Sequence, residues 1–408
     1  MGLLAGAAPL CAAEMERVLA VPVSPTTLHL AIPLPAAVQP QVAGTCQLVE
    51  IDRPDVALPA QRVTASAADG SAAGKDRRLL AEIPPRDGAG PLRRFRIEPA
   101  ETTTPEVTAT DAGHRFQFED VDDKSLKLTD AGEPVLVYNH GLITDEQIPQ
   151  RDSRRSRACY IHPLWGISGE VLTDDFPRDH YHHHGIFWNW PHVGIEGHQY
   201  NFWDGDQIRD KFVAWICRES GPLGAVLAVE NGWFIGQRKV MIERVWLRVF
   251  GVSDQTRSLD VEFTWIPVDR PITLQGAEGK SYGGLTVRFD VKRATDAVII
   301  TPEGRGTDDL KEMPLAWVDL TYPFDPASGL SGAAVFVHPG HPDYPPTWLT
   351  RHYGPLCVGW PGIEAKTFEP GKPIRLDYRI WIHKTAVEPD QLRRAYDGYT
   401  TATRATWE

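Results

Sequence analysis

The sequence predicts an all-β protein, and three observations support this fold class. Long runs alternate between apolar and polar residues, as in Leu259-Asp-Val-Glu-Phe-Thr-Trp265, and this is the period of a strand with one buried face. The chain contains 34 prolines and 35 glycines, which divide it into short segments, as is typical of sandwiches of antiparallel strands. Only one segment has a clear helical pattern. We therefore expect less than roughly a fifth of the chain to be helical, against a usual fraction of about a third.

The N-terminal part of the chain divides into three segments. Residues 1–13 are apolar and end in small residues, like the hydrophobic core and cleavage site of a secretory signal, but they lack the usual basic start. Residues 20–98 hold short strands around a Gly/Ala/Ser-rich loop, which predicts a small β-sandwich domain. Residues 99–113 are rich in Thr, Pro and Ala, which is typical of a linker. From the signal-like segment 1–13 we expect an exported protein, periplasmic or secreted.

The remaining residues, 114–408, predict one large antiparallel β-sandwich that ends in a helix. Besides residues 259–265, the alternating pattern recurs at residues 285–291 and 374–382. The helix is predicted from Glu388 to about Tyr399, because Pro389 and acidic residues open it and Leu392 and Tyr396 lie four residues apart.

The composition of the chain limits the classes of binding partner and of metal site that we expect. The chain has 408 residues, with 42% hydrophobic and 24% charged, as in ordinary soluble proteins. A net charge of -12 argues against nucleic acid or an anionic membrane as the partner, and no later segment has the roughly 18 apolar residues of a membrane span. The five cysteines include no C-x-x-C pair, so a zinc-thiolate site is not expected.

The densest chemical motif is a histidine cluster. Of 14 histidines, four lie in Asp179-His-Tyr-His-His-His-Gly185. Imidazole titrates near neutral pH and is a frequent metal ligand, so the motif predicts a site for acid/base chemistry, substrate or metal. If the stretch is extended, His180, His182 and His184 share one face and His183 lies on the other. The alternative is a set of histidines that satisfy each other's hydrogen bonds.

A metal remains an open alternative at this cluster. His180 and His182 have the H-x-H spacing of cupin metal sites, but Phe187, Trp188 and Asn189 occupy the region where a cupin places its glutamate. If a divalent metal binds, His180 and His182 are its expected ligands, and a third must come from elsewhere. The many aromatic residues near the cluster, Trp188 among them, are explained mostly by core packing, although Trp also stacks on sugar rings.

Three further segments carry candidate residues. Glu243 lies on the apolar face of residues 241–249, where a carboxylate must be paired or have a raised pKa; it suits either a general acid/base or a buried partner of an arginine. The glycine-rich turn 276–284 contains Glu278 and Lys280, and residues 338–354 contain His338 and Arg351. Neither segment precedes a helix, so nucleotide binding is not expected.

Residues from about 135 to 385 resemble the DUF6807 family, whose members have been labelled "methane oxygenase PmoA-like". The resemblance covers residues 160–173, 175–185, 276–288 and 338–354. The D-H-x-H-H core of the family falls on Asp179, His180, His182 and His183, whereas His184 replaces an arginine that is common after it. The resemblance implies a β-sandwich similar to galactose-mutarotase-like supersandwich folds. It also implies carbohydrate as the substrate class, by association, because members of the family often occur beside nicotinamide-dependent sugar dehydrogenases.

The combined hypothesis is an exported carbohydrate-active enzyme, of the glycoside hydrolase, lyase or epimerase class, that acts on a small carbohydrate by His/Glu acid-base catalysis. The expected catalytic residues are His180, His183, Glu243 and Glu278. The expected substrate-binding residues are Asp179, His182, Trp188, Lys280, His338 and Arg351. Two alternatives stay open: a metal-dependent enzyme such as an oxygenase, and a sugar-binding protein without catalysis. We expect His180, His182 and His183 to share one pocket with Lys280 and Arg351.

Overall fold

The computed structural model describes residues 17–36, 38, 45–67, 76–86, 90–99 and 115–408. The predicted signal segment 1–13 and, apart from Pro99, the predicted linker 99–113 lie outside the described residues. Strands account for about 54% of the chain and helix for about 6%, so the all-β prediction is confirmed. No helix among the described residues is both long and apolar enough to span a membrane.

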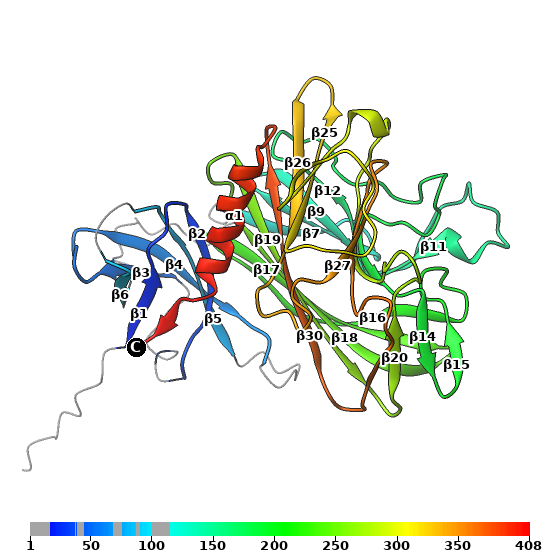
Figure 1. Ribbon diagram of the computed structural model, residues 1–408. Helices are drawn as coiled ribbons and strands as arrows, with labels where there is room; N and C mark the ends of the chain where they lie inside the picture. Colours follow the sequence, from blue (N-terminus) through cyan, green and yellow to red (C-terminus); the bar gives the residue numbers. More distant parts are fainter. Residues whose placement is uncertain (1–16, 37, 39–44, 68–75, 87–89, 100–114) are drawn as a thin grey trace, which may run out of the picture.

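An N-terminal sheet of seven antiparallel strands lies at one end of the molecule (Figure 1, blue). In sheet order its strands are β2 (Leu28–Pro33), β5 (Arg77–Ile83), β4 (Ala57–Thr64), β3 (Thr45–Glu50), β6 (Leu92–Pro99), β1 (Val18–Pro22) and β31 (Thr406–Trp407). The last strand comes from the opposite end of the chain, because Leu19 of β1 pairs with Trp407. The sheet therefore contains both the first and the last strand of the described chain. It has its own apolar cluster, which includes Leu30, Leu48 and Phe95.

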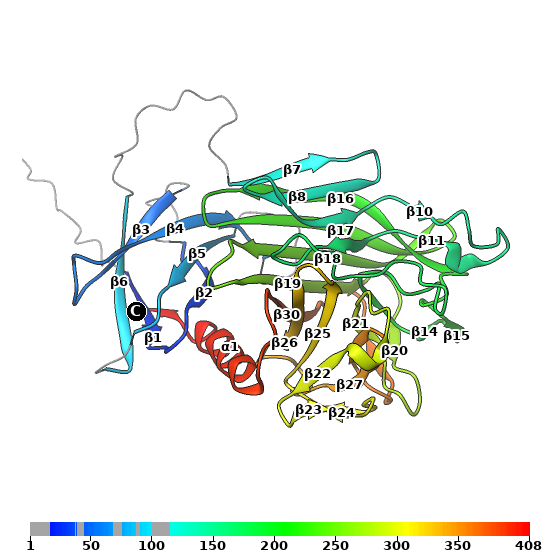
Figure 2. The same ribbon diagram turned by 90° about the horizontal axis from the view of Figure 1, so that it is seen from above.

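Two sheets of nine antiparallel strands form the large sandwich. The first contains, in sheet order, β24 (Met313–Pro314), β27 (Thr347–Thr350), β28 (Pro355–Gly359), β21 (Gly284–Arg288), β13 (Ile186–Asn189), β12 (Tyr160–Leu164), β9 (Glu133–Asn139), β8 (Ser125–Asp130) and β7 (Phe116–Asp120). The second contains β16 (Ile208–Ser220), β17 (Gly224–Ile235), β18 (Arg238–Phe250), β19 (Thr256–Pro267), β30 (Ile374–His383), β26 (Gly329–Val337), β25 (Trp317–Asp325), β22 (Val298–Thr301) and β23 (Gly304–Gly306). Figure 2 shows β16–β19 running from the N-terminal sheet toward the opposite end of the molecule.

The apolar residues of the alternating segments face the space between these two sheets. Trp188 of β13 packs on Phe263 of β19 with ring centroids 4.7 Å apart, and both side chains belong to one continuous core. Burial of such side chains is the main favourable contribution to the stability of the sandwich, at about 25 cal/mol per Å² of apolar surface.

Smaller elements complete the large part of the molecule. A four-stranded sheet contains β15 (His198–Tyr200), β14 (His192–Ile195), β20 (Ile272–Gln275) and β29 (Lys366–Phe368), and β10 (Ile143–Thr144) pairs with β11 (Ser156–Arg157). Two single turns of 3-10 helix, Ser153–Arg155 and Ala294–Asp296, lie in loops.

The single α-helix among the described residues, α1 (Pro389–Ala402), lies where it was predicted. Glu388 caps its N-terminus, and its side chain and that of Gln391 form a reciprocal capping box. Leu392 and Tyr396 are buried against Phe336 of β26. The helix (Figure 1, red) thereby covers the outer face of the second sheet beside the N-terminal sheet.

Polar contacts join the N-terminal sheet to the large sandwich. Gln61 of β4 hydrogen-bonds the backbone of Leu223 and Gly224, and His29 of β2 lies 3.1 Å from the hydroxyl of Ser258. The four cysteines of the described residues are buried and free: Cys46, Cys159, Cys217 and Cys357.

Candidate active site: a histidine pocket

The histidine stretch is folded as two consecutive turns and is not extended. The backbone N–H of His180 donates to the carbonyl of Pro177, and that of His183 donates to the carbonyl of His180, both at 2.9 Å. His180, His182 and His183 therefore point to one side, while His184 faces another. The predicted alternation is wrong because each turn reverses the chain within four residues.

Gly185 ends the double turn and allows the chain to enter β13. Its φ of +39° lies in the left-handed region, and a Cβ there would lie 2.0 Å from the carbonyl oxygen of Ile161. Any other residue at this position would push the turn off the sheet, so the direction of the three histidines depends on this glycine.

The three histidines line a pocket of about 210 Å³ beside the first large sheet. Its other walls come from the loop before β16, the loop between β20 and β21, the strands β27 and β28, and the turn that joins these two strands. The lining residues are His180, His182, His183, Trp203, Lys280, Tyr282, Leu349, Arg351, Tyr353, Pro355 and Cys357. The structure therefore brings together His180, His182, His183, Lys280 and Arg351, as expected from the sequence.

A stack of flat side chains supports one wall of the pocket. The rings of His183 and His180 are parallel, with centroids 4.6 Å apart, and Tyr353 stacks on His180 at 5.4 Å. The guanidinium of Arg288 lies over the Tyr353 ring at 5.0 Å. Because His180 stacks against both His183 and Tyr353, the plane of its ring is fixed.

Asp179 lies at the Nδ1 edge of His180. Its Oδ2 is 3.0 Å from that nitrogen, an ion-pair distance whose angle is poor for a hydrogen bond. Arg288 donates from Nη2 to both oxygens of Asp179, at 3.0 and 3.2 Å. Arg288 thus holds Asp179, and Asp179 lies beside His180, which is the order of groups by which enzymes orient an imidazole base. This order leaves Nε2 of His180 for the pocket.

His182 and His183 are held neutral. Burial lowers the pKa of His183 well below its ordinary value, with a further contribution from neighbouring His182 and Arg288. Burial also lowers the pKa of His182 to about 4. Nη1 of Arg288 lies 3.5 Å from Nδ1 of His183 and can only donate, so His183 carries its proton on Nε2 and can act as a hydrogen-bond donor in the pocket.

His184 belongs to a buried network behind the pocket. Its Nδ1 lies 2.8 Å from Oδ1 of Asp175, and the hydroxyl of Tyr160 donates to the other oxygen at 2.7 Å. Burial raises the pKa of Asp175 to about 6. This network ties the turn to β12 and explains how His184, which replaces the usual arginine, is accommodated.

Glu243 lies outside the pocket, in the core of the second sheet. Its carboxylate is fully buried and accepts hydrogen bonds from the indole N–H groups of Trp233 and Trp265, at 2.9 and 2.8 Å, and from Asn231 at 3.0 Å. Three neutral donors satisfy the charge, so neither a catalytic role nor an arginine partner is needed to explain this residue.

Replacement of Glu243 by Leu is therefore expected to reduce stability and not activity. The substitution leaves two buried indole N–H groups without an acceptor, at about 1–3 kcal/mol each. Chemical denaturation should show the loss of stability, whereas the turnover of the folded fraction should stay within about twofold of wild type. A loss of turnover in fully folded Glu243→Leu protein would return Glu243 to the catalytic residues.

Three other predicted residues also lie elsewhere. Trp188 is buried in the core between the sheets, Glu278 is exposed on its loop outside the pocket lining, and His338 lines a different cavity. Their residue types are compatible with a site, but Trp188 belongs to the sandwich core, Glu278 to the loop surface and His338 to the interface with the N-terminal sheet.

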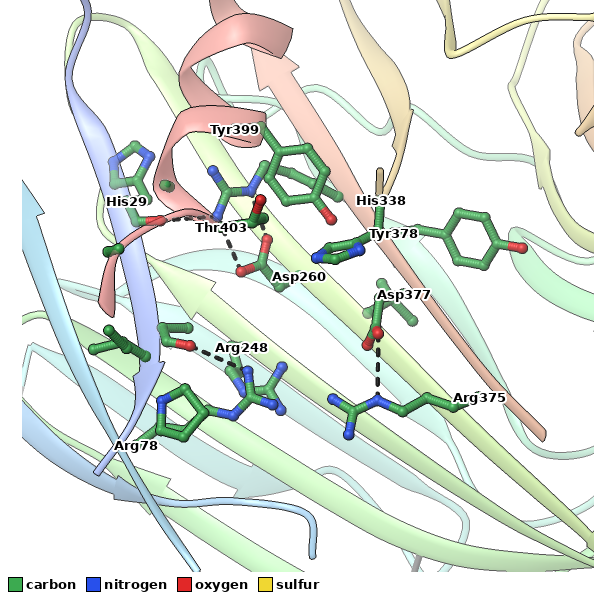
Figure 3. A pocket seen from close by; sticks show the side chains of 17 residues that line it. His29, Arg78, Arg248, Asp260, His338, Arg375, Asp377, Tyr378, Tyr399 and Thr403 are labelled. Carbon is green, nitrogen blue, oxygen red and sulfur yellow. Dashed lines mark hydrogen bonds and ion pairs between the residues drawn. The ribbon is translucent and has the colours of Figure 1, made fainter. Parts of the chain in front are cut away.

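The cavity beside His338, of about 240 Å³, lies between the N-terminal sheet, the second large sheet and α1 (Figure 3). Arg379 pairs with Asp260 at 2.6 Å, and Arg375 lies 3.3 Å from Asp377. Figure 3 shows His338 directed into the same space. Since its arginines are paired with carboxylates, we interpret this cavity as an ion-pair network that joins the sheets.

The geometry of the cluster also bears on the metal alternative. The rings of His180 and His182 are nearly perpendicular, at 80°, with centroids 5.6 Å apart. Among the residues that the structure describes, no group of three or more His, Cys, Asp or Glu side chains is arranged to hold a metal ion.

Sequence reasoning missed several residues of the site. Arg288 is the most important, because it contacts Asp179, His183 and Tyr353 at once. In the sequence it stands among the polar positions of the alternating segment 285–291, which gave no sign that the structure would bury it. Trp203, Tyr282, Tyr353 and Cys357 also line the pocket, but nothing in their local sequence distinguishes them from core residues.

Comparison with known families places the chain. A model described as a family of unknown function (DUF6807) matches residues 125–397. The chain belongs to the DUF6807 family. The match includes the double turn, Arg288 and all the lining residues of the histidine pocket.

Similarity to other proteins is distant. A putative kojibiose phosphorylase from the human microbiome aligns with TM-score 0.29 and 8% identity, over 69% of this chain and 32% of its own. A 4-alpha-glucanotransferase from Thermococcus litoralis aligns with TM-score 0.24 and 12% identity, over 66% of this chain and 39% of its own. The chain thus spans well under half of either structure, and similarity at this level says nothing about activity. No curated protein matches the chain.

Proposed function

We propose that the histidine pocket is the active site of a carbohydrate-active enzyme in which His180 is the general base. The observation that carries the proposal is the fixed, oriented imidazole: His180 stacks against two aromatic rings and has Asp179 at its Nδ1 edge, anchored by Arg288. A base must be held at hydrogen-bond distance from the proton it removes, and such preorganisation is typical of catalytic groups.

The pocket fits lyase or epimerase chemistry better than hydrolysis. Glycoside hydrolases usually act through two carboxylates on either side of the scissile bond. Glu243 and Glu278, the carboxylates considered for this role, lie away from the pocket. The charged groups in its wall are the cations Lys280 and Arg351, which suit a reaction in which negative charge develops on the substrate.

Carbohydrate is proposed as the substrate because the pocket wall combines polar and apolar side chains. Imidazole, phenol and cationic donors can bind hydroxyl groups, while Trp203, Leu349 and Pro355 offer apolar surface to the C–H faces of a ring. The volume of about 210 Å³ suits a single sugar ring. We also propose, as the sequence suggested, that the protein is exported; detection of the protein in the periplasmic or secreted fraction of its source cell would test this.

The experiment is a turnover screen with purified protein and a panel of neutral and acidic glycosides, in wild type and in His180→Gln. His198→Gln is the matched control, because His198 is exposed on the hairpin of β14 and β15 and lies outside the pocket. We expect turnover by wild type and by the control but not by His180→Gln.

Two further measurements on the same purified protein distinguish the proposal from the sugar-binding protein and from the metal-dependent enzyme. Saturable binding of sugars to the pocket without turnover would replace the enzyme by a sugar-binding protein. Stoichiometric iron or copper by elemental analysis, together with oxygen consumption on substrate addition, would favour the metal-dependent enzyme.

A further inference from the structure

We propose that the substrate is a sugar acid, and that the enzyme removes the proton on the carbon next to the carboxylate. This inference rests on the proposed function, since it names the substrate class of the same pocket. The argument comes from the charges of the pocket wall, from the states of its histidines and from the chemistry that these groups can perform together.

Lys280 and Arg351 are both available to an anion. Lys280 is exposed at the pocket mouth, and its ammonium has no acidic partner among the described residues. Arg351 donates from Nη1 to the carbonyls of Thr350 and Leu310, at 2.9 and 3.3 Å, and its Nε is 3.7 Å from Asp309. These contacts fix the guanidinium in place and leave Nη2 for a ligand.

The other polar groups of the wall do not neutralise these cations. His182 and His183 are neutral because burial lowers both pKa values, and burial raises the pKa of the Cys357 thiol to about 11. No carboxylate of the described residues lines the pocket itself, and Asp204 and Asp309 lie behind His182 at 4.0 Å and Arg351 at 3.7 Å. An unpaired lysine and an arginine with one loose acidic contact favour a ligand with a negative charge, and a planar carboxylate matches the fork of an arginine.

Binding of a carboxylate would also activate the neighbouring C–H bond. Nε2 of His180 takes the proton from the carbon next to the carboxylate, and the electron pair left on that carbon is delocalised into the carboxylate, whose added charge Lys280 and Arg351 stabilise. The Nε2–H of His183 is a third donor to the same oxygens.

Two outcomes then conserve all atoms and electrons. In β-elimination the electron pair forms a C=C bond, the C–O bond on the next carbon breaks, and the departing oxygen takes a proton. In epimerisation a proton returns to the opposite face of the same carbon. Neither outcome needs an oxidant or a reductant.

Tyr282 is suitably placed to give the proton to the departing oxygen. It lines the pocket, and burial raises its pKa, so it stays a phenol at neutral pH.

The test compares sugars that differ only in charge. The probes are D-glucuronate and D-galacturonate, their short oligosaccharides, the corresponding glucose and galactose compounds, and glucose 6-phosphate. Affinity is measured by calorimetry, proton removal by deuterium incorporation at C5 in heavy water, and elimination by the ultraviolet absorbance of the unsaturated product.

Wild type is expected to bind and exchange the sugar acids, and Lys280→Met to reduce their affinity by about ten- to hundred-fold while the affinity for neutral sugars changes little. Arg351→Met should have the same effect. Lys372→Met, at an exposed lysine outside the pocket, is the matched control and should behave as wild type.

Equal or better turnover of neutral sugars, or binding of the sugar phosphate in preference to the sugar acids, would overturn the sugar-acid inference and leave the proposed function intact. If no sugar of either charge bound or reacted, the proposed function itself would fail.

Discussion

Replacement of His180 by Gln is expected to lower kcat by roughly 10²–10⁴-fold, the range that general acid–base catalysis contributes. Gln keeps a polar side chain beside Asp179 but cannot accept and hold a proton at the position of Nε2. The effect should appear in kcat with a small change in KM, because the lost interaction forms only in the transition state.

Stability should change little in this variant. His180 is partly exposed, with 36% of its side chain accessible, and its stacking partners Tyr353 and His183 keep their other contacts. We expect the melting temperature to stay within a few degrees of wild type, since such a residue contributes little to the core.

A second variant separates orientation from proton transfer. Asp179→Asn keeps the imidazole but removes the negative charge beside Nδ1, so a smaller fall in kcat is expected. Unfolding of His180→Gln would mean that the histidines are structural, and full activity in a folded variant would rule His180 out as the base.

The fold could be predicted from the sequence because its pattern is local. The alternation at residues 259–265 lies in β19, and the capping residues of α1 lie beside the helix that they begin. The alternating pattern predicted that one face of β19 is buried and, by implication, that its polar face is solvated. The polar face is in fact covered by the N-terminal sheet. Glu262 is 1% exposed there, and only the tertiary arrangement reveals why a charge occupies that position.

The site could be predicted in part, for the same reason. The histidine cluster is local and dense, so it was found, whereas its supporting partner Arg288 lies 105 residues from His183 along the chain. Period-2 alternation identified Glu243 as a buried carboxylate, but the donors that satisfy it come from two neighbouring strands. Residue type and local pattern thus identify candidates, and long-range packing decides which of them meet.

Glu262→Gln is expected to destabilise the protein by about 3–5 kcal/mol, the usual result of breaking a buried ion pair. Glu262 forms ion pairs with Arg248 at 2.6 Å, Arg375 at 2.9 Å and Arg78 at 3.5 Å, and it accepts a hydrogen bond from the hydroxyl of Ser66. Arg78 and Ser66 belong to the N-terminal part of the chain, so this carboxylate joins the N-terminal sheet to the large sandwich. The isosteric amide would leave three guanidiniums, of which that of Arg248 is buried, without their shared anion.

The pH dependence gives this prediction a second readout. Burial alone would raise the pKa of Glu262, but the charges of Arg248, Arg78 and Arg375 outweigh it and lower the pKa from 4.5 to about 2. Because the pKa is lower in the folded state, the stabilisation is complete above about pH 4.5 and is lost as the pH falls toward 2. The stability difference between wild type and Glu262→Gln should therefore be constant near neutral pH and should shrink in acid.

Glu119→Gln is the matched control for this measurement. Glu119 pairs with Lys127 at the surface and is 61% exposed, so its replacement should change the free energy of unfolding by less than about 1 kcal/mol at any pH. Chemical denaturation of the three proteins across the acid range would give both comparisons. If Glu262→Gln were as stable as the Glu119 control at neutral pH, the arginines would be solvated well enough without the carboxylate, and Glu262 would not stabilise the contact between the N-terminal sheet and the large sandwich.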